Sequence, residues 1–170
     1  MPAGEKVLLV DDREDNLFAL HSALSPLGFP LESATSGDAA LKAVLRGGVA
    51  VTVLDVVMPG VSGLDVLRYM QRLEQTRRIP VILVTGMGVD AQLSRTAMRL
   101  GAADLLMKPI DPWALCIKVR YLHHAARGRP LPVEAPGRQE SPAAPAWSAP
   151  SAGPDRPPSP ADRAGRAGYP

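Results

Sequence analysis

Short runs of apolar residues alternate along the first three quarters of the chain with segments whose apolar residues recur every three or four positions. Apolar runs of this length predict buried strands, and the three-to-four spacing predicts amphipathic helices. Strands are expected at residues 6–10, 31–34, 49–54, 80–84 and 103–107. Helices are expected at residues 14–27, 39–45, 62–73, 90–100 and 111–126. This alternation is typical of an α/β domain with a parallel sheet.

Residues with strong capping or turn preferences lie between these elements. Ser36 and Ser62 suit helix N-caps, and Asp65 places a negative charge in the first turn of the helix that follows Ser62. Pro80 stands at the start of a strand, where no ladder donor is lost. Five strand–helix units with right-handed crossovers give a three-layer sandwich with helices on both faces, and five strands favour the doubly wound order 2-1-3-4-5.

The composition changes abruptly after Arg127. Eleven of the eighteen prolines lie in residues 128–170, together with many Ala, Gly and Ser residues, and no apolar periodicity continues. Such a segment cannot bury enough apolar surface to offset the entropy lost on ordering. We therefore expect a folded domain at 1–127 and a disordered Pro/Ala-rich tail at 128–170.

Overall composition narrows the class of protein. Hydrophobic residues make up 46% of the chain and aromatic residues 4%, so the core is expected to be aliphatic. The net charge is +2 with no basic run, and we therefore expect no direct DNA binding. Cys116 is the sole cysteine, and the apolar run near the N-terminus is too short for a signal peptide or membrane span. A cytoplasmic location without membrane association is expected.

Polar side chains follow four of the expected strands where each strand ends. Asp11 and Asp12 follow the first strand, Asp55 the third, Thr85 the fourth and Lys108 the fifth. Side chains at the carboxyl ends of parallel strands converge on one rim of the sheet, where ligands bind. Three carboxylates, a hydroxyl and an ammonium group are therefore expected in one cleft.

This set of groups suits a hard cation beside a phosphoryl group. Neighbouring carboxylates repel one another, and the pKa of at least one should rise unless a cation lies among them. Oxygen ligands in small number, with positions left for water and substrate, favour Mg²⁺. Asp55 could serve as metal ligand, base or nucleophile, and attack on a phosphoryl donor would give an aspartyl phosphate. Lys108 and Thr85 would then contact phosphoryl oxygens.

The chain resembles the receiver domain of bacterial two-component response regulators over roughly residues 5–126. The matching stretches are Val10-Asp11-Asp12, Leu54-Asp55-Val56-Val57-Met58-Pro59-Gly60 with Gly63, Val84-Thr85-Gly86, Gly101-Ala102 and Lys108-Pro109. The resemblance implies a flavodoxin-like (CheY-like) fold with Asp55 as the phosphoacceptor. It implies that Asp11, Asp12, Asp55 and the backbone carbonyl of Val57 hold Mg²⁺. It implies that Thr85 is the switch hydroxyl and that Lys108 contacts the phosphoryl group.

Two details of the resemblance bear on signalling and lifetime. Leu105 occupies the position, three residues before the lysine, where the family commonly has Tyr or Phe, so this chain lacks the aromatic side chain through which the family commonly signals. Output through backbone movement of the loop 86–89 is the alternative. Val57 and Met87 are bulky and apolar at positions that border the path of the attacking water in this family. We therefore expect slow spontaneous hydrolysis of the phosphoryl group.

The favoured function is that of a single-domain response regulator, a phosphorylation-controlled switch rather than an enzyme acting on other substrates. A sensor histidine kinase or phosphotransfer protein would supply the phosphoryl group, and an unknown downstream protein would receive the signal. A homodimer through the face of the fourth helix, fifth strand and fifth helix is also possible on this reading. The alternative is a phosphorylation-independent, receiver-like binding scaffold. A nucleotide-binding enzyme or aspartate-based phosphatase is disfavoured, because no glycine-rich loop follows the first strand and Val57 replaces the second aspartate.

Two groups of residues outside the expected cleft have simpler interpretations. His21, His123 and His124 fall on expected helices, and we interpret them as ordinary surface or boundary residues. Trp113, Ile117 and Tyr121 recur every four positions on the last helix. Packing against the domain is the preferred interpretation of these three residues, and a partner or dimer face is the alternative.

Overall fold

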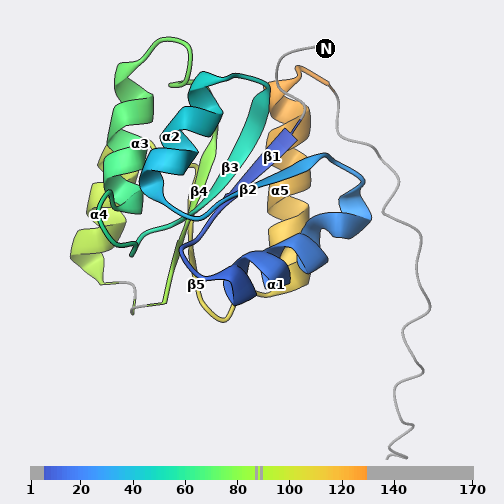
Figure 1. Ribbon diagram of the computed structural model, residues 1–170, viewed down its shortest axis with the longest axis horizontal. Helices are drawn as coiled ribbons and strands as arrows, with labels where there is room; N and C mark the ends of the chain where they lie inside the picture. Colours follow the sequence, from blue (N-terminus) through green and yellow to red (C-terminus); the bar gives the residue numbers. More distant parts are fainter. Residues whose placement is uncertain (1–5, 87, 89, 130–170) are drawn as a thin grey trace, which may run out of the picture. The chain divides into compact units, whose positions relative to one another are not determined.

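The computed structural model describes residues 6–86, 88 and 90–129 (Figure 1). The expected tail lies outside the described residues from residue 130 onward, as does Met87. The strands are β1 (Lys6–Val10), β2 (Leu31–Ala34), β3 (Val49–Asp55), β4 (Val81–Thr85) and β5 (Asp104–Met107). The helices are α1 (Glu14–Leu24), the 3₁₀ turn η1 (Ser25–Leu27), α2 (Gly37–Leu45), α3 (Gly63–Arg72), α4 (Ala91–Arg99) and α5 (Pro112–Ala126).

All five strands run parallel in one sheet with the order β2-β1-β3-β4-β5, which confirms the predicted topology. The register pairs Val10 of β1 with Leu54 of β3, and Thr85 of β4 with Met107 of β5. From β1 the chain adds β2 toward one edge of the sheet and β3, β4 and β5 toward the other edge, so the strand order reverses between β1 and β3. That is the switch point at which doubly wound sheets bind their ligands.

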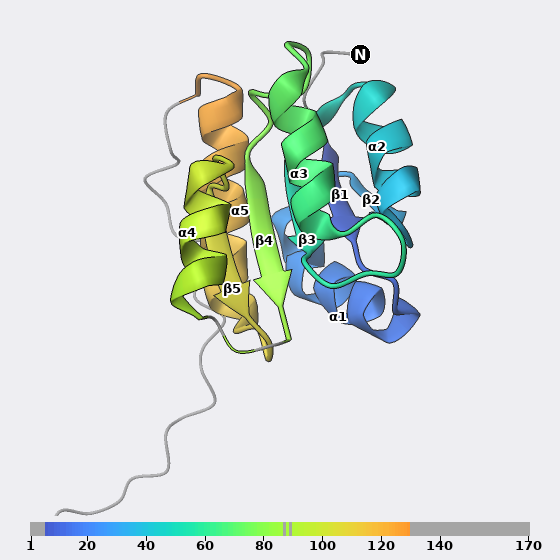
Figure 2. The same ribbon diagram turned by 90° about the vertical axis from the view of Figure 1, so that its left-hand side faces the viewer.

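Alternate residues of each central strand enter different cores on the two faces of the sheet. Val7 and Leu9 of β1 pack with residues of α1 and α5, whereas Leu8 and Val10 pack with residues of α2, α3 and α4. Figure 2 shows α2, α3 and α4 on one side of the sheet and α1 and α5 on the other. Every residue of β3 is buried, as expected for a strand covered on both faces.

Local chemistry explains where the helices begin and end. The Ser36 side chain accepts a hydrogen bond from the backbone of Ala39 at 3.1 Å, so α2 begins at Gly37, two residues before its expected start. Ser62 and Asp65 form a reciprocal capping box at the start of α3. The first helix was expected to continue to Leu27, but it ends at Leu24 and continues as a 3₁₀ turn containing Pro26. Proline cannot donate the backbone bond that a longer α-helix requires.

The structure corrects the interpretation of His123. This side chain is 1% exposed and therefore lies in the interior rather than at the surface. Its ring stacks on that of Phe29, with ring centroids 3.8 Å apart and an interplanar angle of 11°. His124 meets Phe29 edge-on at 6.2 Å, and His21 is exposed as expected. The stack joins the end of α5 to the segment between η1 and β2.

The structure also overturns the packing interpretation of the aromatic stripe on α5. Trp113, Ile117 and Tyr121 are 61%, 44% and 53% exposed, respectively. The inward face of α5 instead carries Leu115 and Val119, both fully buried. The alternative interpretation as a partner face is therefore the one compatible with the exposure of these three side chains.

Within the described residues, no helix combines the length and apolar character needed to cross a membrane.

Candidate functional site

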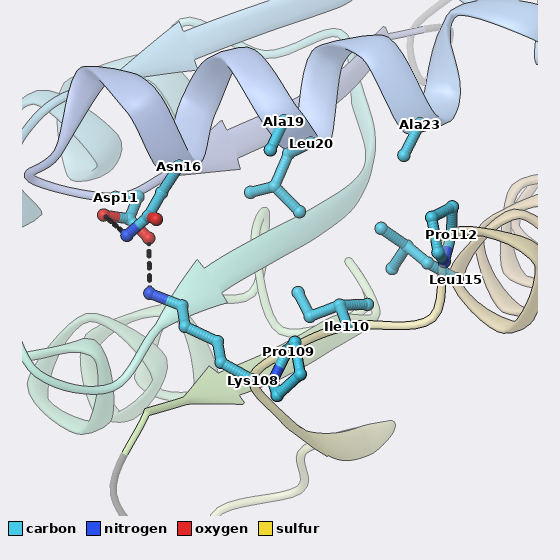
Figure 3. Close-up of a pocket in the computed structure, with 10 residues that line it drawn as sticks. All are labelled: Asp11, Asn16, Ala19, Leu20, Ala23, Lys108, Pro109, Ile110, Pro112 and Leu115. Carbon is cyan, nitrogen blue, oxygen red and sulfur yellow. Dashed lines mark hydrogen bonds and ion pairs between the residues drawn. The ribbon is translucent and has the colours of Figure 1, made fainter.

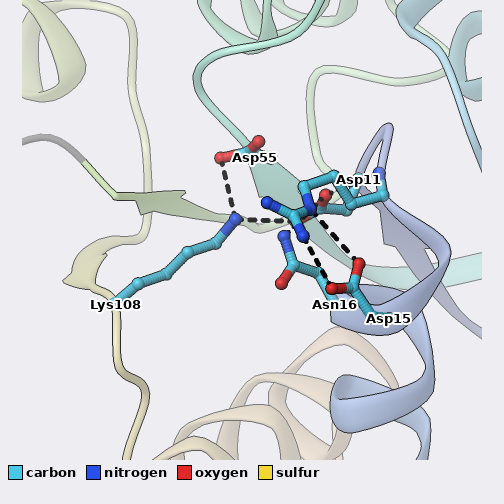
Figure 4. A network of polar contacts seen from close by, with 6 residues as sticks. Asp11, Asp15, Asn16, Asp55 and Lys108 are labelled. Atoms are coloured by element: carbon cyan, nitrogen blue, oxygen red, sulfur yellow. Dashed lines mark hydrogen bonds and ion pairs between the residues drawn. The ribbon is translucent and has the colours of Figure 1, made fainter.

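Figure 4 shows three of the predicted polar residues, Asp11, Asp55 and Lys108, close together at the carboxyl ends of their strands. Asp55 is the last residue of β3 and Thr85 the last of β4, while Asp11 and Lys108 directly follow β1 and β5. One carboxylate oxygen from each of Asp11, Asp12 and Asp55 lies within 4.8 Å of the others. Strand order alone brings these residues together, because β1, β3, β4 and β5 end at the same rim.

Lys108 links two of the three carboxylates. Its Nζ donates a hydrogen bond to Asp11 Oδ2 at 2.8 Å and lies 3.5 Å from Asp55 Oδ1. The second distance is that of an ion pair rather than a short hydrogen bond. The ammonium group therefore belongs more closely to Asp11 than to Asp55.

The Asp55 carboxylate is buried with fewer hydrogen-bond partners than a buried charged group usually has. The residue is 5% exposed, and its Oδ1 is buried without a hydrogen-bond partner. Burial is the main cause that raises the pKa of the Asp55 carboxyl above its usual range, and the negative charge of Asp11 raises it further. Lys108 opposes this shift without cancelling it. The site therefore favours addition of a cation or modification of the carboxylate.

Asp11 is fixed by its own neighbours in the chain. Its Oδ1 accepts hydrogen bonds from the backbone N–H of Arg13 and from Asn16 Nδ2, both at 3.0 Å. The side chain is 1% exposed, whereas Asp12 is exposed beside it. Asn16 was not among the site residues predicted from the sequence. Its place in the first turn of the helix, five residues after Asp11, is the signal that could have identified it.

Backbone bonds tie the loops of the rim together at Thr85. The Thr85 carbonyl accepts a hydrogen bond from the backbone N–H of Lys108 at 2.8 Å, and the residue is fully buried. One residue earlier, the carbonyl of Val84 accepts from the N–H of Val56 at 2.8 Å. These two bonds fix the starts of the segments that follow β3 and β5 relative to β4.

Gly63 permits a close approach of α3 to the end of β3. A Cβ at this position would lie 2.1 Å from the backbone oxygen of Asp55. The Gly63 N–H donates to the carbonyl of Val56 at 3.0 Å, so the first turn of α3 is held against the residue after Asp55. A side chain at residue 63 would displace the backbone that carries the Asp55 carboxylate.

The cluster fits the magnesium ion that the resemblance implies. The donor groups are carboxylate oxygens, no His or Cys belongs to the cluster, and Asp55 Oδ1 is buried with its acceptor capacity unused. Hard oxygen donors of this kind suit Mg²⁺. The residues that would hold it are Asp11, Asp12 and Asp55.

An apolar groove continues from this cluster between α1 and the segment leading into α5 (Figure 3). Its volume is about 550 Å³. Asp11, Asn16 and Lys108 lie at its polar end, and Leu20 and Ile110 are among the side chains along its walls. The side chains at the polar end are therefore shared between the groove and the carboxylate cluster.

Two further predicted residues, Val57 and Leu105, are among the described residues. Val57 is 53% exposed just beyond β3, and Leu105 is partly buried in β5, packed against the core beneath α2, α3 and α4. Met87 lies outside the described residues, so its expected place beside the water path stays a prediction.

Comparisons with known proteins place this arrangement in a family. The chain matches the response regulator receiver domain over residues 7–120. It is 36% identical over 118 residues to "Response regulator PleD" of Caulobacter vibrioides, an alignment that covers 69% of this chain and 26% of that protein. It is 41% identical over 120 residues to the C4-dicarboxylate transport transcriptional regulatory protein DctD of Pseudomonas aeruginosa, with 69% and 25% covered. The chain thus spans about a quarter of the length of these relatives.

Solved structures agree with the fold. The signal receiver domain of an HD domain-containing protein from Pseudomonas fluorescens superposes with a TM-score of 0.67 at 27% identity. That alignment covers 74% of this chain and 99% of the solved chain. A receiver domain protein from Clostridium thermocellum gives a TM-score of 0.65 at 28% identity, with 72% and 96% covered.

Proposed function

The chain belongs to the response regulator receiver family, and we propose on that basis that Asp55 accepts a phosphoryl group and thereby switches protein–protein interactions. The carrying observation is the buried Asp55 carboxylate, which has an unused acceptor atom and lies beside Lys108 and Asp11. Residues 1–127 would form the switching unit. The domain would catalyse only its own phosphorylation and dephosphorylation.

In the proposed reaction an Asp55 carboxylate oxygen forms a bond to phosphorus, and the bond between phosphorus and the donor's leaving group breaks. Lys108 would turn its ammonium group from Asp11 toward a phosphoryl oxygen, a short movement because it already lies 3.5 Å from Asp55 Oδ1. The Thr85 hydroxyl would donate to a second phosphoryl oxygen. Together these groups would stabilise the transferring phosphoryl group mainly by position and charge.

Mg²⁺, when bound, would supply positive charge for the phosphoryl oxygens. Asp11, Asp12, Asp55 and the backbone carbonyl of Val57 would hold it. In the described structure the Lys108 ammonium group offsets part of the negative charge of the carboxylates through its contacts with Asp11 and Asp55. This arrangement supports a resting state in which the charge of the carboxylate cluster is partly neutralised before Mg²⁺ binds.

Receiver domains interact with histidine kinases, and a cytoplasmic sensor histidine kinase or phosphotransfer protein is the proposed donor for this chain. The output would be a contact with a downstream protein or with a second copy of this chain. A contact on one side of the molecule is supported by exposed apolar side chains there: Trp113, Ile117 and Tyr121 on α5, Met107 of β5 and Met98 of α4.

Leu105 lacks the aromatic ring that the family commonly uses, so signalling would depend on aliphatic repacking or backbone movement. Val57 and Met87 would slow loss of the phosphoryl group.

Incubation with acetyl phosphate and Mg²⁺, followed by intact-mass measurement, tests this function. The expected result is a mass gain of one phosphoryl group that is absent from the Asp55→Asn variant. An equally labelled variant, or an unlabelled wild type under conditions that label a known receiver, would instead favour the phosphorylation-independent scaffold.

A further inference from the structure

Asn16 is a polar residue on an apolar face of α1. It shares this face with Ala19, Leu20 and Ala23, and together they form one wall of the groove (Figure 3). These positions are three or four residues apart, so they lie on one side of the helix. Asn16 is half-buried, and asparagine is a weaker helix former than leucine. Helix propensity and packing along the groove would therefore both favour an apolar residue at position 16.

The Asn16 amide instead holds the Asp11 carboxylate. Its Nδ2 donates to Asp11 Oδ1 at 3.0 Å (Figure 3), and the backbone N–H of Arg13 donates to the same oxygen at 3.0 Å. The other oxygen, Asp11 Oδ2, accepts from Lys108 Nζ at 2.8 Å. Asp11 is 1% exposed, so these donors take the place of water around a buried carboxylate. The two oxygens of Asp11 thus have separate partners, and the orientation of the carboxylate is fixed.

Asn16 and Lys108 differ in what the proposed reaction requires of them. Lys108 also lies 3.5 Å from Asp55 Oδ1 and would turn toward a phosphoryl oxygen there. Asp11 Oδ2 would then lose its donor, whereas the bond from Asn16 to Oδ1 would remain. Asn16 would therefore keep the carboxylate in place while Lys108 moves. It would do so without adding positive charge beside the acidic cluster.

We propose that Asn16 is a positioning residue that orients the Asp11 carboxylate for Mg²⁺ and so lowers the Mg²⁺ concentration needed to phosphorylate Asp55. The inference rests on the magnesium site within the proposed function. Hydrogen bonds to a ligating carboxylate fix its orientation, and their removal typically weakens metal binding by about 10- to 100-fold. Asn16 acts through Asp11 and takes no part in the transfer itself.

Asn16→Leu tests the proposal, because leucine has nearly the same shape as asparagine but donates no hydrogen bond. By calorimetric titration of the full chain, Mg²⁺ should bind Asn16→Leu about tenfold more weakly than the wild type. Asn16→Ala, which adds no bulk, should behave in the same way. Ala19→Leu is the matched control, since it places the same side chain in the groove wall and leaves the bond to Asp11 intact. Its Mg²⁺ affinity should equal that of the wild type.

The Mg²⁺ dependence of labelling separates positioning from a merely structural role. With acetyl phosphate and Mg²⁺ at the dissociation constant of the wild type, Asn16→Leu should be labelled about fivefold more slowly, because fewer sites hold the cation. Saturating Mg²⁺ should restore the wild-type rate. A structural defect would lower the rate at every Mg²⁺ concentration. Circular dichroism in chelator should show cooperative unfolding of each variant.

Unchanged or tighter Mg²⁺ binding in both Asn16 variants would overturn the proposal. An equal loss of affinity in Ala19→Leu, or a wild type that binds no Mg²⁺, would overturn it as well. A labelling rate that saturating Mg²⁺ does not restore would show that Asn16 has a structural role instead. If the wild type takes no label while Asn16→Leu still weakens Mg²⁺ binding, the proposed function fails and the role of Asn16 toward the cation stands.

Discussion

Replacing Asp55 by Asn should stabilise the metal-free protein. The Asp55 side chain is 7% exposed, and its Oδ1 is buried without a hydrogen-bond partner. Burial and the charge of Asp11 both disfavour the ionised carboxyl, and Lys108 at 3.5 Å offsets this only in part. The amide of Asn has similar size and no charge. The substitution thus removes an unfavourable buried charge and leaves the bond between Lys108 and Asp11 in place.

The size of this effect can be worked from general magnitudes. A buried polar group left without a partner is destabilising by about 1–3 kcal/mol, and the opposing attraction of Lys108 reduces the net gain to about 1–2 kcal/mol. An unfolding entropy of about 2.1 cal/mol/K per residue, over roughly 120 residues, converts 1 kcal/mol into a Tm change of about 4 °C. Asp55→Asn should therefore raise Tm by about 4–8 °C in the presence of a chelator.

The effect should depend on pH with a definite sign. Because the pKa of Asp55 is raised in the folded state, the folded protein binds more protons than the unfolded chain between the usual carboxyl pKa and the raised value. The contribution of Asp55 to stability is therefore full below that window and is lost as the pH rises through it. The stability advantage of Asp55→Asn should be small in acid and reach its full size at neutral pH.

Thermal unfolding followed by circular dichroism, with and without Mg²⁺, measures these quantities. Mg²⁺ at about 100 times its dissociation constant should stabilise the wild type by about 2.7 kcal/mol, and the variant by much less. Asp12→Asn is the matched control, because Asp12 belongs to the same cluster but is exposed. In chelator it should gain clearly less than Asp55→Asn. A Tm of Asp55→Asn equal to or below that of the wild type in chelator would refute the reasoning.

Three further substitutions test the packing of the domain. Thr52→Val should stabilise the domain by about 1 kcal/mol in urea unfolding, because Thr52 Oγ1 is fully buried without a hydrogen-bond partner; a loss of stability would contradict this. Gly63→Ala should lower the unfolding free energy by about 1–3 kcal/mol, since its Cβ would lie 2.1 Å from the Asp55 backbone oxygen, whereas Gly88→Ala, with no atom within 4 Å, should change it little. His123→Ala should destabilise by about 2 kcal/mol through loss of the stack on Phe29, and an effect no larger than that of His124→Ala would show that the stack contributes little.

Much of the fold could be predicted because its signals are local. The buried run of β3 and the capping residues Ser36 and Ser62 each fix an element through its own sequence, and the alternation of elements then leaves few possible strand orders. Asp55 and Lys108 were placed together for the same reason, since a strand end is a local feature with a defined place in the sheet.

The remaining features depend on contacts between distant segments. Nothing near His123 in the sequence indicates that its ring will stack on Phe29, because that contact depends on how the end of α5 meets the segment before β2. The helical spacing of Trp113 and Tyr121 predicts a common face but not the direction in which that face points. The close approach at Gly63 likewise depends on the path of the chain between β3 and α3.

Lys108 joins several strands at one point of the rim. Its backbone N–H is bonded to the last residue of β4, and its ammonium group connects the ends of β1 and β3. If that ammonium group turns toward a phosphoryl oxygen on Asp55, it gives up its bond to Asp11. The loop after β1 would then be released from the β5 side in the modified form alone. Once Mg²⁺ is removed with a chelator, amide exchange at residues 12 and 13 would accordingly be faster in the phosphorylated protein than in the unmodified one, even though neither residue carries the new group.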